Sequence, residues 1–307
     1  MRVAVVDLGT NSTRLLVADV TGGRVDELDR RTTVTRLGEG VDASGRLADT
    51  AMERVFAAVA DYRATIDELG AERTVAVATS AVRDSANGEE FRSALLDRYA
   101  IDARTISGDE EARLTFLGAT SARPPGARSV VIDIGGGSTE FVVGRAGAQP
   151  EFHVSTQAGS VRQTERHMPT DPPPPGEVTA LRDEVRAIVE EAVPADVRAS
   201  AEAGIAVAGT ATQLAAIDQQ LDPYDPDRVD GYTLTLEACE RMLADLAAKP
   251  LEERRATPGL HPDRAPTIVA GAGILVEAIR AFELEAVEVS EADILHGAAL
   301  TASAKPQ

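Results

Sequence analysis

The sequence predicts an α/β protein of two lobes, and three observations support this prediction. Segments typical of strands alternate with segments typical of helices along the chain. A short turn motif, Asp-x-Gly-x-x-Ser-Thr, occurs twice, beginning at Asp7 and at Asp133. A stretch rich in proline and glycine, 121–128, lies between the two copies and would stop a helix. We therefore expect residues 1–122 to form the first lobe and residues 123–307 the second, with the last helix able to pack back on the first.

The first lobe is expected to open with a buried strand at 3–6, because four consecutive apolar residues precede Asp7. A second apolar run at 15–20 follows within hairpin distance. Helical periodicity and a stop signal predict a helix that ends at Gly70. The further expected elements are a helix over 50–69, a strand over 73–78, helices over 89–99 and 109–120, a strand from 130, helices over 177–193 and 235–248, and a strand, turn and helix around 206–214.

The amino-acid composition of the chain excludes some classes of binding partner. The formal net charge is −19, so the chain lacks the basic surface typical of a nucleic-acid-binding protein. Aromatic residues make up 3% of the chain and Trp is absent, which leaves few side chains on which bases could stack. We therefore expect no nucleic-acid partner. A phosphate ligand would have to be bound by backbone amides, a few arginines and a metal ion.

The single cysteine, Cys239, excludes an internal disulfide and a cysteine-rich zinc site, and we expect it to serve packing. The segment 1–7 is too short and too early charged to be a signal peptide. No apolar run approaches the roughly 18 residues of a membrane span. The sequence therefore predicts a cytoplasmic protein without membrane attachment.

The repeated turn predicts phosphate binding. Its glycines let the backbone approach a phosphate, its hydroxyls and amides can form an anion-binding nest, and its leading aspartate, Asp7 or Asp133, can hold hydrated Mg²⁺. One copy alone could be an ordinary hairpin turn, but two copies separated by a domain length favour phosphate. The expected phosphate-binding residues are Gly9, Thr10, Asn11 and Ser12 in the first copy and Gly135, Gly136, Gly137, Ser138 and Thr139 in the second.

The two copies differ at their eighth position, which is Arg14 in the first and Glu140 in the second. The first copy could therefore present a cation to phosphate, while the second presents a carboxylate to a metal ion. The alternative is that both are ordinary exposed strand residues.

An acidic helix start provides a candidate base. Ser107 and Glu110 form a capping box, which gives Glu110 a structural task. Glu111 lies in the same first turn without that task, where the helix dipole favours its ionised form. Glu111 could therefore accept a proton from water. The alternative is a solvated acidic helix start.

Three further residues could contact phosphate. Arg83 follows a strand, where its planar fork of donors suits phosphate, although a local pair with Asp84 is the alternative. Gly209 and Thr210 begin a helix after a strand, so the amides there could bind a further phosphate. The four histidines are scattered and have no spacing typical of metal ligands.

Together these motifs resemble the exopolyphosphatase/guanosine pentaphosphate phosphatase family, which belongs to the superfamily of actin, sugar kinases, acetate kinase and DnaK-type chaperones. The segments 78–83 and 107–112 resemble motifs specific to this family. The tail 293–297 differs from the commoner Leu-Arg-Glu-Gly ending, and longer members carry extra C-terminal helical domains. The matching segments are 7–12, 78–87, 106–114, 131–140, 207–214, 264–275 and 289–300.

The resemblance implies two ribonuclease-H-like lobes, with mixed sheets flanked by helices and an active-site cleft between them. It implies hydrolysis of the terminal phosphate of inorganic polyphosphate, with short chains as the expected substrate. It further implies a homodimer that uses Mg²⁺ or, as the alternative, Mn²⁺. It implies that Glu111 is the catalytic base and that Asp133 and Glu140 serve the metal. Arg83 matches the family's arginine.

Three alternatives remain open at this point. Guanosine pentaphosphate could be the substrate, with Arg14 and Arg264 as the extra ligand contacts. The phosphoryl group could instead pass to a nucleotide or small molecule, because the superfamily contains kinases. A non-catalytic phosphate sensor is the third alternative, although Glu111, Asp133 and Glu140 are all present.

Overall fold

The computed structural model describes residues 1–304, and the chain divides into two compact units. Unit 1 comprises Met1–Arg123 together with the segment that begins at Ala292, and unit 2 comprises Pro124–Glu291. The first crossing between the units therefore falls inside the proline- and glycine-rich stretch. The second crossing assigns helix α14 (Ile294–Ser303) to unit 1.

Unit 1 is built on a mixed five-stranded sheet in the order β3-β2-β1-β4-β5. Strand β1 pairs antiparallel with β2 and parallel with β4, so the first turn motif joins two neighbouring central strands. The predicted hairpin and the strand after Gly70 are confirmed. The strands are β1 (Arg2–Leu8), β2 (Ser12–Thr21), β3 (Arg24–Val34), β4 (Arg73–Ala78) and β5 (Ala103–Thr105).

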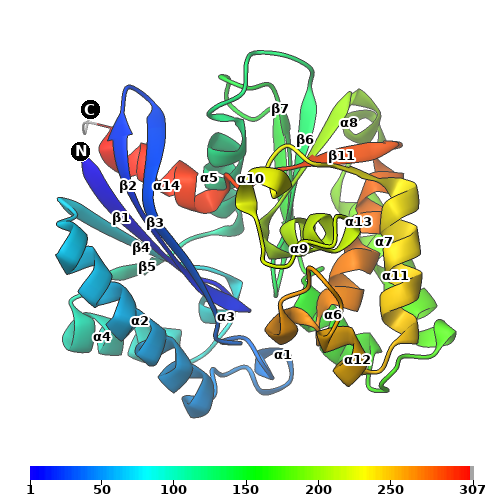
Figure 1. The fold of residues 1–307 in the computed structure, drawn as a ribbon, viewed down its shortest axis with the longest axis horizontal. Coiled ribbons are helices and arrows are strands. Elements are labelled where there is room, and N and C mark those ends of the chain that lie inside the picture. The colour runs from blue at the N-terminus through cyan, green and yellow to red at the C-terminus, as the bar shows by residue number, and fades with distance from the viewer. Residues whose placement is uncertain (305–307) are drawn as a thin grey trace. The chain divides into compact units, whose positions relative to one another are not determined.

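Alternation along β1 and β2 divides their side chains between two cores. Ala4 and Val6 pack in a core with residues of α2 and α4, whereas Val3 and Val5 pack in a core with residues of α14. Asp7 continues the second series and therefore points to the α14 face. Figure 1 shows α2 on one side of this sheet and α14 on the other. The helices of unit 1 are α1 (Val41–Ser44), α2 (Asp49–Leu69), α3 (Ser80–Arg83), α4 (Gly88–Tyr99), α5 (Gly108–Thr120) and α14.

Local signals in the sequence explain where these helices begin and end. Gly70 ends α2 with φ = 66°, a left-handed conformation that glycine adopts without strain. Ser107 caps α5 by accepting a hydrogen bond from the Glu110 amide at 3.2 Å. The Glu110 carboxylate pairs with Arg104, with 2.7 Å between Oε2 and Nη1. Ser107 therefore caps the helix as predicted, and Glu110 has a structural task through Arg104.

Unit 2 is built on a mixed six-stranded sheet in the order β10-β11-β9-β6-β7-β8. Strands β6 and β7 are antiparallel and flank the second turn motif, and β6 is parallel to β9. The central strands of the two sheets are thus joined in the same way. The strands are β6 (Ser129–Ile134), β7 (Thr139–Gly144), β8 (Phe152–Thr156), β9 (Ala203–Val207), β10 (Thr233–Thr235) and β11 (Ala286–Val289).

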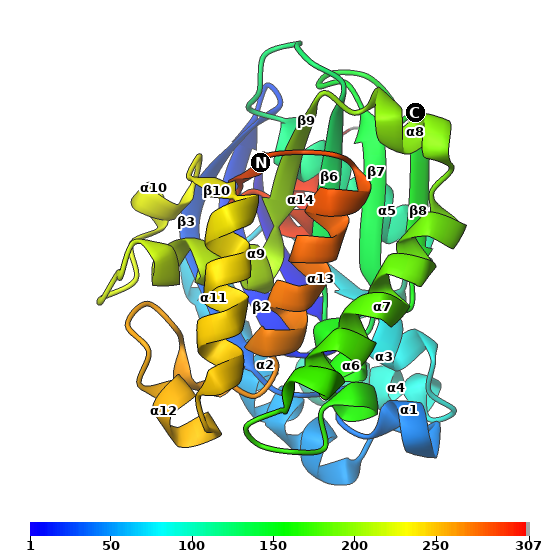
Figure 2. The ribbon, with the colours of Figure 1, turned by 90° about the vertical axis from the view of Figure 1, so that its right-hand side faces the viewer.

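Helices α7, α11 and α13 form a layer on unit 2, with α13 between the other two (Figure 2). Gly273 allows α13 to approach Leu181 of α7 closely. Cys239 is buried in this core, and burial raises the pKa of its thiol to about 12. The helices are α6 (Ser160–His167), α7 (Pro175–Ala192), α8 (Ala195–Ser200), α9 (Ala208–Asp218), α10 (Pro226–Val229), α11 (Leu236–Ala248), α12 (Leu251–Arg255), the 3-10 helix Pro262–Arg264 and α13 (Ile268–Ala281).

Candidate functional site

The first turn is closed by its glycine and anchored through its carbonyl groups. The Gly9 amide donates to the Ser12 carbonyl at 3.0 Å, and a β-carbon on Gly9 would lie only 2.8 Å from that oxygen. The carbonyl of Thr10 accepts from the Gly38 amide at 2.8 Å, and the carbonyl of Asn11 accepts from amides of the next segment. Because N–H and C=O point oppositely in a trans peptide, the amides of Asn11 and Ser12 point away from this anchor. They are suitably oriented to receive an anion.

The strand register places Asp7 directly opposite Arg14, and the two side chains form a buried ion pair. Arg14 Nε and Nη2 both donate to Asp7 Oδ2, at 2.8 and 2.6 Å. Arg14 Nη1 pairs with Asp293, which precedes α14. Arg14 therefore commits its three guanidinium nitrogens to two carboxylates. This geometry gives Arg14 a structural task, and the ligand contact expected of it stays a prediction.

The other carboxylate oxygen of Asp7 supports its expected role near a cation. Asp7 Oδ1 is buried and, within residues 1–304, has no hydrogen-bond partner. Burial raises the pKa of Asp7, while Arg14 opposes that rise. A buried, unsatisfied carboxylate oxygen is costly, so a metal-bound water at this position would relieve it. The residue fits the hydrated metal expected from the sequence.

Glu111 and Arg83 come together in unit 1, although the sequence separates them by two elements. Glu111 is buried in the first turn of α5, and Arg83 ends the short helix α3. Arg83 Nη1 donates to Glu111 Oε2 at 3.2 Å and to the Ile106 carbonyl at 3.0 Å. Arg83 Nε also lies 3.8 Å from the carboxylate of Asp84. The arginine thus orients the candidate base as well as forming the local pair.

The second turn repeats the hydrogen bonding of the first. The Gly135 amide donates to the Ser138 carbonyl at 3.0 Å. The carbonyls of Gly135 and Gly136 accept from amides at the start of α6, and Arg162 Nε donates to the Gly137 carbonyl at 2.9 Å. The amides that follow these carbonyls therefore point away from α6. Again the carbonyl side anchors the turn and the donor side remains oriented for an anion.

Thr139 does not contribute its hydroxyl to this donor side. Its side chain is fully buried, and Oγ1 donates to the carbonyl of Ala158 at 2.5 Å. The hydroxyl is thereby fixed to a neighbouring segment, and the phosphate contact expected of Thr139 stays a prediction. Thr10 is similar, since its hydroxyl shares a hydrogen bond with that of Ser80 at 2.7 Å.

The register of β6 and β7 places Asp133 directly opposite Glu140. Both are buried, with Glu140 only 1% exposed, and Ser155 Oγ donates to Glu140 Oε1 at 2.7 Å. Like charges directly opposite each other destabilise a sheet, and a bound cation removes that penalty. Two carboxylates also match the small number of protein ligands with which Mg²⁺ is held beside phosphates. The pair therefore fits the expected metal.

A larger metal cage is not present in the described part of the chain. Within residues 1–304, no three His, Cys, Asp or Glu side chains are grouped so that they could hold one ion. A metal at Asp133 and Glu140 would consequently take its remaining ligands from water and substrate oxygens. This is the usual arrangement for Mg²⁺ in phosphate sites.

The third turn brings Gly209, Thr210 and Arg264 together. The guanidinium of Arg264 occupies the space that a β-carbon on Gly209 would fill. Thr210 is buried and packs closely against Gly271 of α13. Ala208, the first residue of α9, has φ = 63°, a conformation that is strained for alanine. Arg264 therefore lies at the turn to which the sequence assigned a further phosphate.

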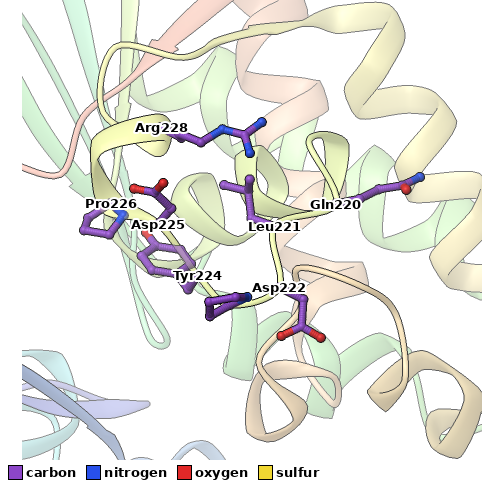
Figure 3. A pocket seen from close by; sticks show the side chains of 8 residues that line it. Gln220, Leu221, Asp222, Tyr224, Asp225, Pro226 and Arg228 are labelled. Atoms are coloured by element: carbon purple, nitrogen blue, oxygen red, sulfur yellow. The ribbon is translucent and has the colours of Figure 1, made fainter.

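A polar hollow lies in the loop after α9 and is separate in sequence from the turns described above. It has a volume of about 390 Å³ and is lined by residues 220–226 and Arg228 (Figure 3). Its lining includes the carboxylates of Asp222 and Asp225, which disfavour a polyanion. We assign it no phosphate.

Sequence reasoning missed the contribution of Asp293. Its side chain caps α14, accepting from the Leu295 amide at 3.0 Å. An aspartate directly before the apolar residues of a helix is a recognisable capping signal. The pairing with Arg14 had no such signal, because 279 residues separate the two.

Among the described helices, none is long and apolar enough to cross a membrane.

Comparisons with known proteins show the family to which the chain belongs. The model of the Ppx/GppA phosphatase family matches residues 16–303. Exopolyphosphatase 2 of Mycobacterium tuberculosis is 39% identical to this chain, and the match covers 98% of each. Exopolyphosphatase 1 of Mycobacterium bovis is 31% identical over 94% of this chain and 84% of its own length.

Solved structures are similar over almost the whole chain. The Ppx/GppA family member of Aquifex aeolicus has a TM-score of 0.82 and 30% identity, covering 98% of this chain and 97% of its own. An exopolyphosphatase from Cytophaga hutchinsonii has a TM-score of 0.90 and 26% identity, with the same coverage. These similarities confirm the predicted fold class of two mixed sheets flanked by helices. The chain belongs to the Ppx/GppA phosphatase family.

Proposed function

We propose that this chain is an exopolyphosphatase, which hydrolyses the terminal phosphoanhydride bond of inorganic polyphosphate and acts best on short chains. The observation that carries the proposal is the ion pair of the buried Glu111 with the partly buried Arg83. A turn that merely binds phosphate does not need a buried carboxylate at a helix start. Two relatives at 39% and 31% identity bear the name exopolyphosphatase, which supports the same substrate.

In this proposal Glu111 acts as the general base. It accepts a proton from water as the water oxygen attacks the terminal phosphorus, and the bond from phosphorus to the bridging oxygen breaks. The products are inorganic phosphate and a polyphosphate shorter by one unit. Arg83 holds the Glu111 carboxylate in one orientation through Oε2. Phosphoryl transfer depends mainly on such positioning and on charge stabilisation.

The two turns and a metal ion would neutralise the substrate charge. The amides of Asn11 and Ser12 in unit 1, and those of Gly136 and Gly137 in unit 2, are oriented to bind phosphoryl oxygens. Mg²⁺, or Mn²⁺, held by Asp133 and Glu140 would supply Lewis-acid stabilisation of those oxygens. Local donors must supply this binding because the chain as a whole carries a charge of −19.

Glu111→Gln tests the proposal. It keeps the shape of the side chain and one oxygen that can accept from Arg83 but removes the base, so phosphate release should fall by about 10²–10⁴-fold. Binding of tripolyphosphate, measured by calorimetry with Mg²⁺, should change little. Glu110→Gln is the matched control, because Glu110 lies in the same turn but pairs with Arg104. Full activity of Glu111→Gln would overturn the assignment.

A substrate panel tests the finer choice. Polyphosphates of defined length and guanosine pentaphosphate should be compared for phosphate release with and without Mg²⁺. Arg264 at Gly209 is the side chain that could favour the nucleotide. Faster release from guanosine pentaphosphate than from every polyphosphate would overturn the polyphosphate assignment.

A further inference from the structure

We propose that Asp293 is a positioning residue: its carboxylate holds the Arg14 guanidinium against Asp7 and so ties helix α14 to the first turn. The proposal rests on the function proposed above, which gives Asp7 and the turn their role. It also gives a task to the tail 293–297, whose sequence departs from the family's commoner ending.

The contacts of Asp293 divide its two oxygens between helix and turn. Oδ1 accepts from the Leu295 amide at 3.0 Å and thereby caps α14. Oδ2 pairs with Arg14 Nη1, and the side chain is only 1% exposed. Because Arg14 Nε and Nη2 both engage Asp7, the planar guanidinium is fixed from two sides. One orientation of Arg14, and with it one of Asp7, is selected.

The balance of charge requires both acidic partners to be considered together. Asp7 and Asp293 are buried and share Arg14 as their common cation. Arg30 is more distant, with Nη2 at 3.9 Å from Asp293 Oδ2. Removal of the Asp293 charge would take away the anion that holds Nη1 from the side of α14, and the orientation of the guanidinium on Asp7 would be less firmly fixed. Asp293 therefore acts through Arg14.

The backbone of the same residue contacts the helix that carries Glu111. The carbonyl of Asp293 approaches Gly118 of α5 so closely that any side chain at 118 would overlap it. One turn later, Gly297 is equally close to the carbonyl of Leu114. Helices α14 and α5 are therefore fixed in register by direct backbone contact. Asp293 therefore contacts α5 through its backbone carbonyl and Arg14, beside the first turn, through its side chain.

A double-mutant cycle separates this role from a purely structural one. Asp293→Asn keeps a good helix cap but removes the charge. Loss of positioning should lower kcat for tripolyphosphate by about 10- to 100-fold. In an Arg14→Gln background the same change should lower kcat less than about twofold, because coupled residues are not additive. An equal loss in both backgrounds would overturn the proposal.

The control is Asp19→Asn, which breaks the ion pair with Arg2 at the opposite end of the same hairpin. It should leave kcat and KM unchanged. Amide hydrogen exchange provides a readout that needs no substrate: Asp293→Asn should speed exchange at residues 9–13, whereas Asp19→Asn should not. If the unchanged protein releases no phosphate, the proposed function fails, and the exchange result still decides the role of Asp293. Equal protection of 9–13 in both variants would refute that role.

Discussion

The two turns share a backbone and differ in the charge of one strand position. In each turn the first glycine donates to the serine carbonyl at 3.0 Å, and in each the leading aspartate faces the eighth residue across the strands. In unit 1 that residue is Arg14, so the aspartate is neutralised within the protein. In unit 2 it is Glu140, so two carboxylates meet. One register position thus separates a turn whose aspartate is paired with an arginine through one oxygen from a turn in which two carboxylates face each other.

Converting the second turn into the first should have the largest effect. Glu140→Arg places an arginine opposite Asp133, which should form the ion pair seen in unit 1 and exclude the metal. A bound metal stabilises the transition state by several kcal/mol, and its loss corresponds to a fall in kcat of about 10³-fold or more. Phosphate release over a Mg²⁺ titration measures it. Glu140→Gln is the control and should raise the Mg²⁺ requirement with a smaller loss, whereas an unchanged Mg²⁺ dependence of Glu140→Arg would contradict the comparison.

The reverse conversion should mainly affect stability. Arg14→Glu would leave Asp7 and Asp293 as buried carboxylates beside a third acid. Removing one partner of a buried ion pair typically costs about 3–5 kcal/mol. Urea unfolding, followed by circular dichroism, measures the loss. Arg2→Glu breaks a more exposed pair in the same hairpin and should cost much less. Equal midpoints for the two variants would show that the Arg14 network contributes nothing.

The glycines that close the turns should differ in their tolerance of alanine. A β-carbon at Gly9 would lie 2.8 Å from the Ser12 carbonyl oxygen, and one at Gly135 would lie 3.1 Å from the Ser138 oxygen. Overpacking of this kind typically costs about 1–3 kcal/mol, and we expect the larger cost at Gly9. Thermal unfolding of Gly9→Ala and Gly135→Ala tests the order. If Gly135→Ala were the more destabilising variant, the two turns would have to relax in different ways despite their shared geometry.

The smallest expected effect is on the stability of the folded chain at acidic pH. Burial alone would raise the pKa of Asp293, but Arg14, Arg30 and His296 outweigh burial and hold that pKa below its usual 3.8. Such a carboxyl stabilises the folded chain above the unfolded pKa, and the contribution is lost as pH falls through the folded value. Asp293→Asn should therefore show a weaker loss of stability below about pH 4. Urea midpoints across this range measure it, with the exposed Asp102→Asn as control. An identical pH profile for the two variants would contradict it.

Local signals carried most of the fold. Gly70 marked the end of α2, and the strand over 73–78 was predicted with the bounds that the structure has. Strand β3 was missed because its eleven residues are largely polar and exposed at the edge of the sheet, so it has no apolar run. Element prediction therefore failed where tertiary pairing, and not local preference, forms the strand.

The candidate site was only partly predictable for a related reason. The sequence indicated Glu111 and Arg83 separately, but their contact depends on how α3 and α5 meet at the end of the sheet. The difference between Arg14 and Glu140 was visible in the repeat, yet the task of Arg14 was not. That task requires Asp293, which lies 279 residues from Arg14 in the sequence and reaches it only in the folded structure. The spacing of residues in the sequence cannot reveal a contact that only the folded chain forms.

Assignment of α14 to unit 1 has a consequence for synthesis on the ribosome. One face of the β1–β2 hairpin, including Val3, Val5 and Leu16, packs in a core with Leu295 and Ala299. All 168 residues from Pro124 to Glu291 are translated between the two partners. The nascent hairpin must therefore keep an apolar face uncovered while unit 2 emerges, and exposed apolar surface in such intermediates favours aggregation. Unit 1 can therefore complete its second core only after α14, the last element of the described chain, has been translated.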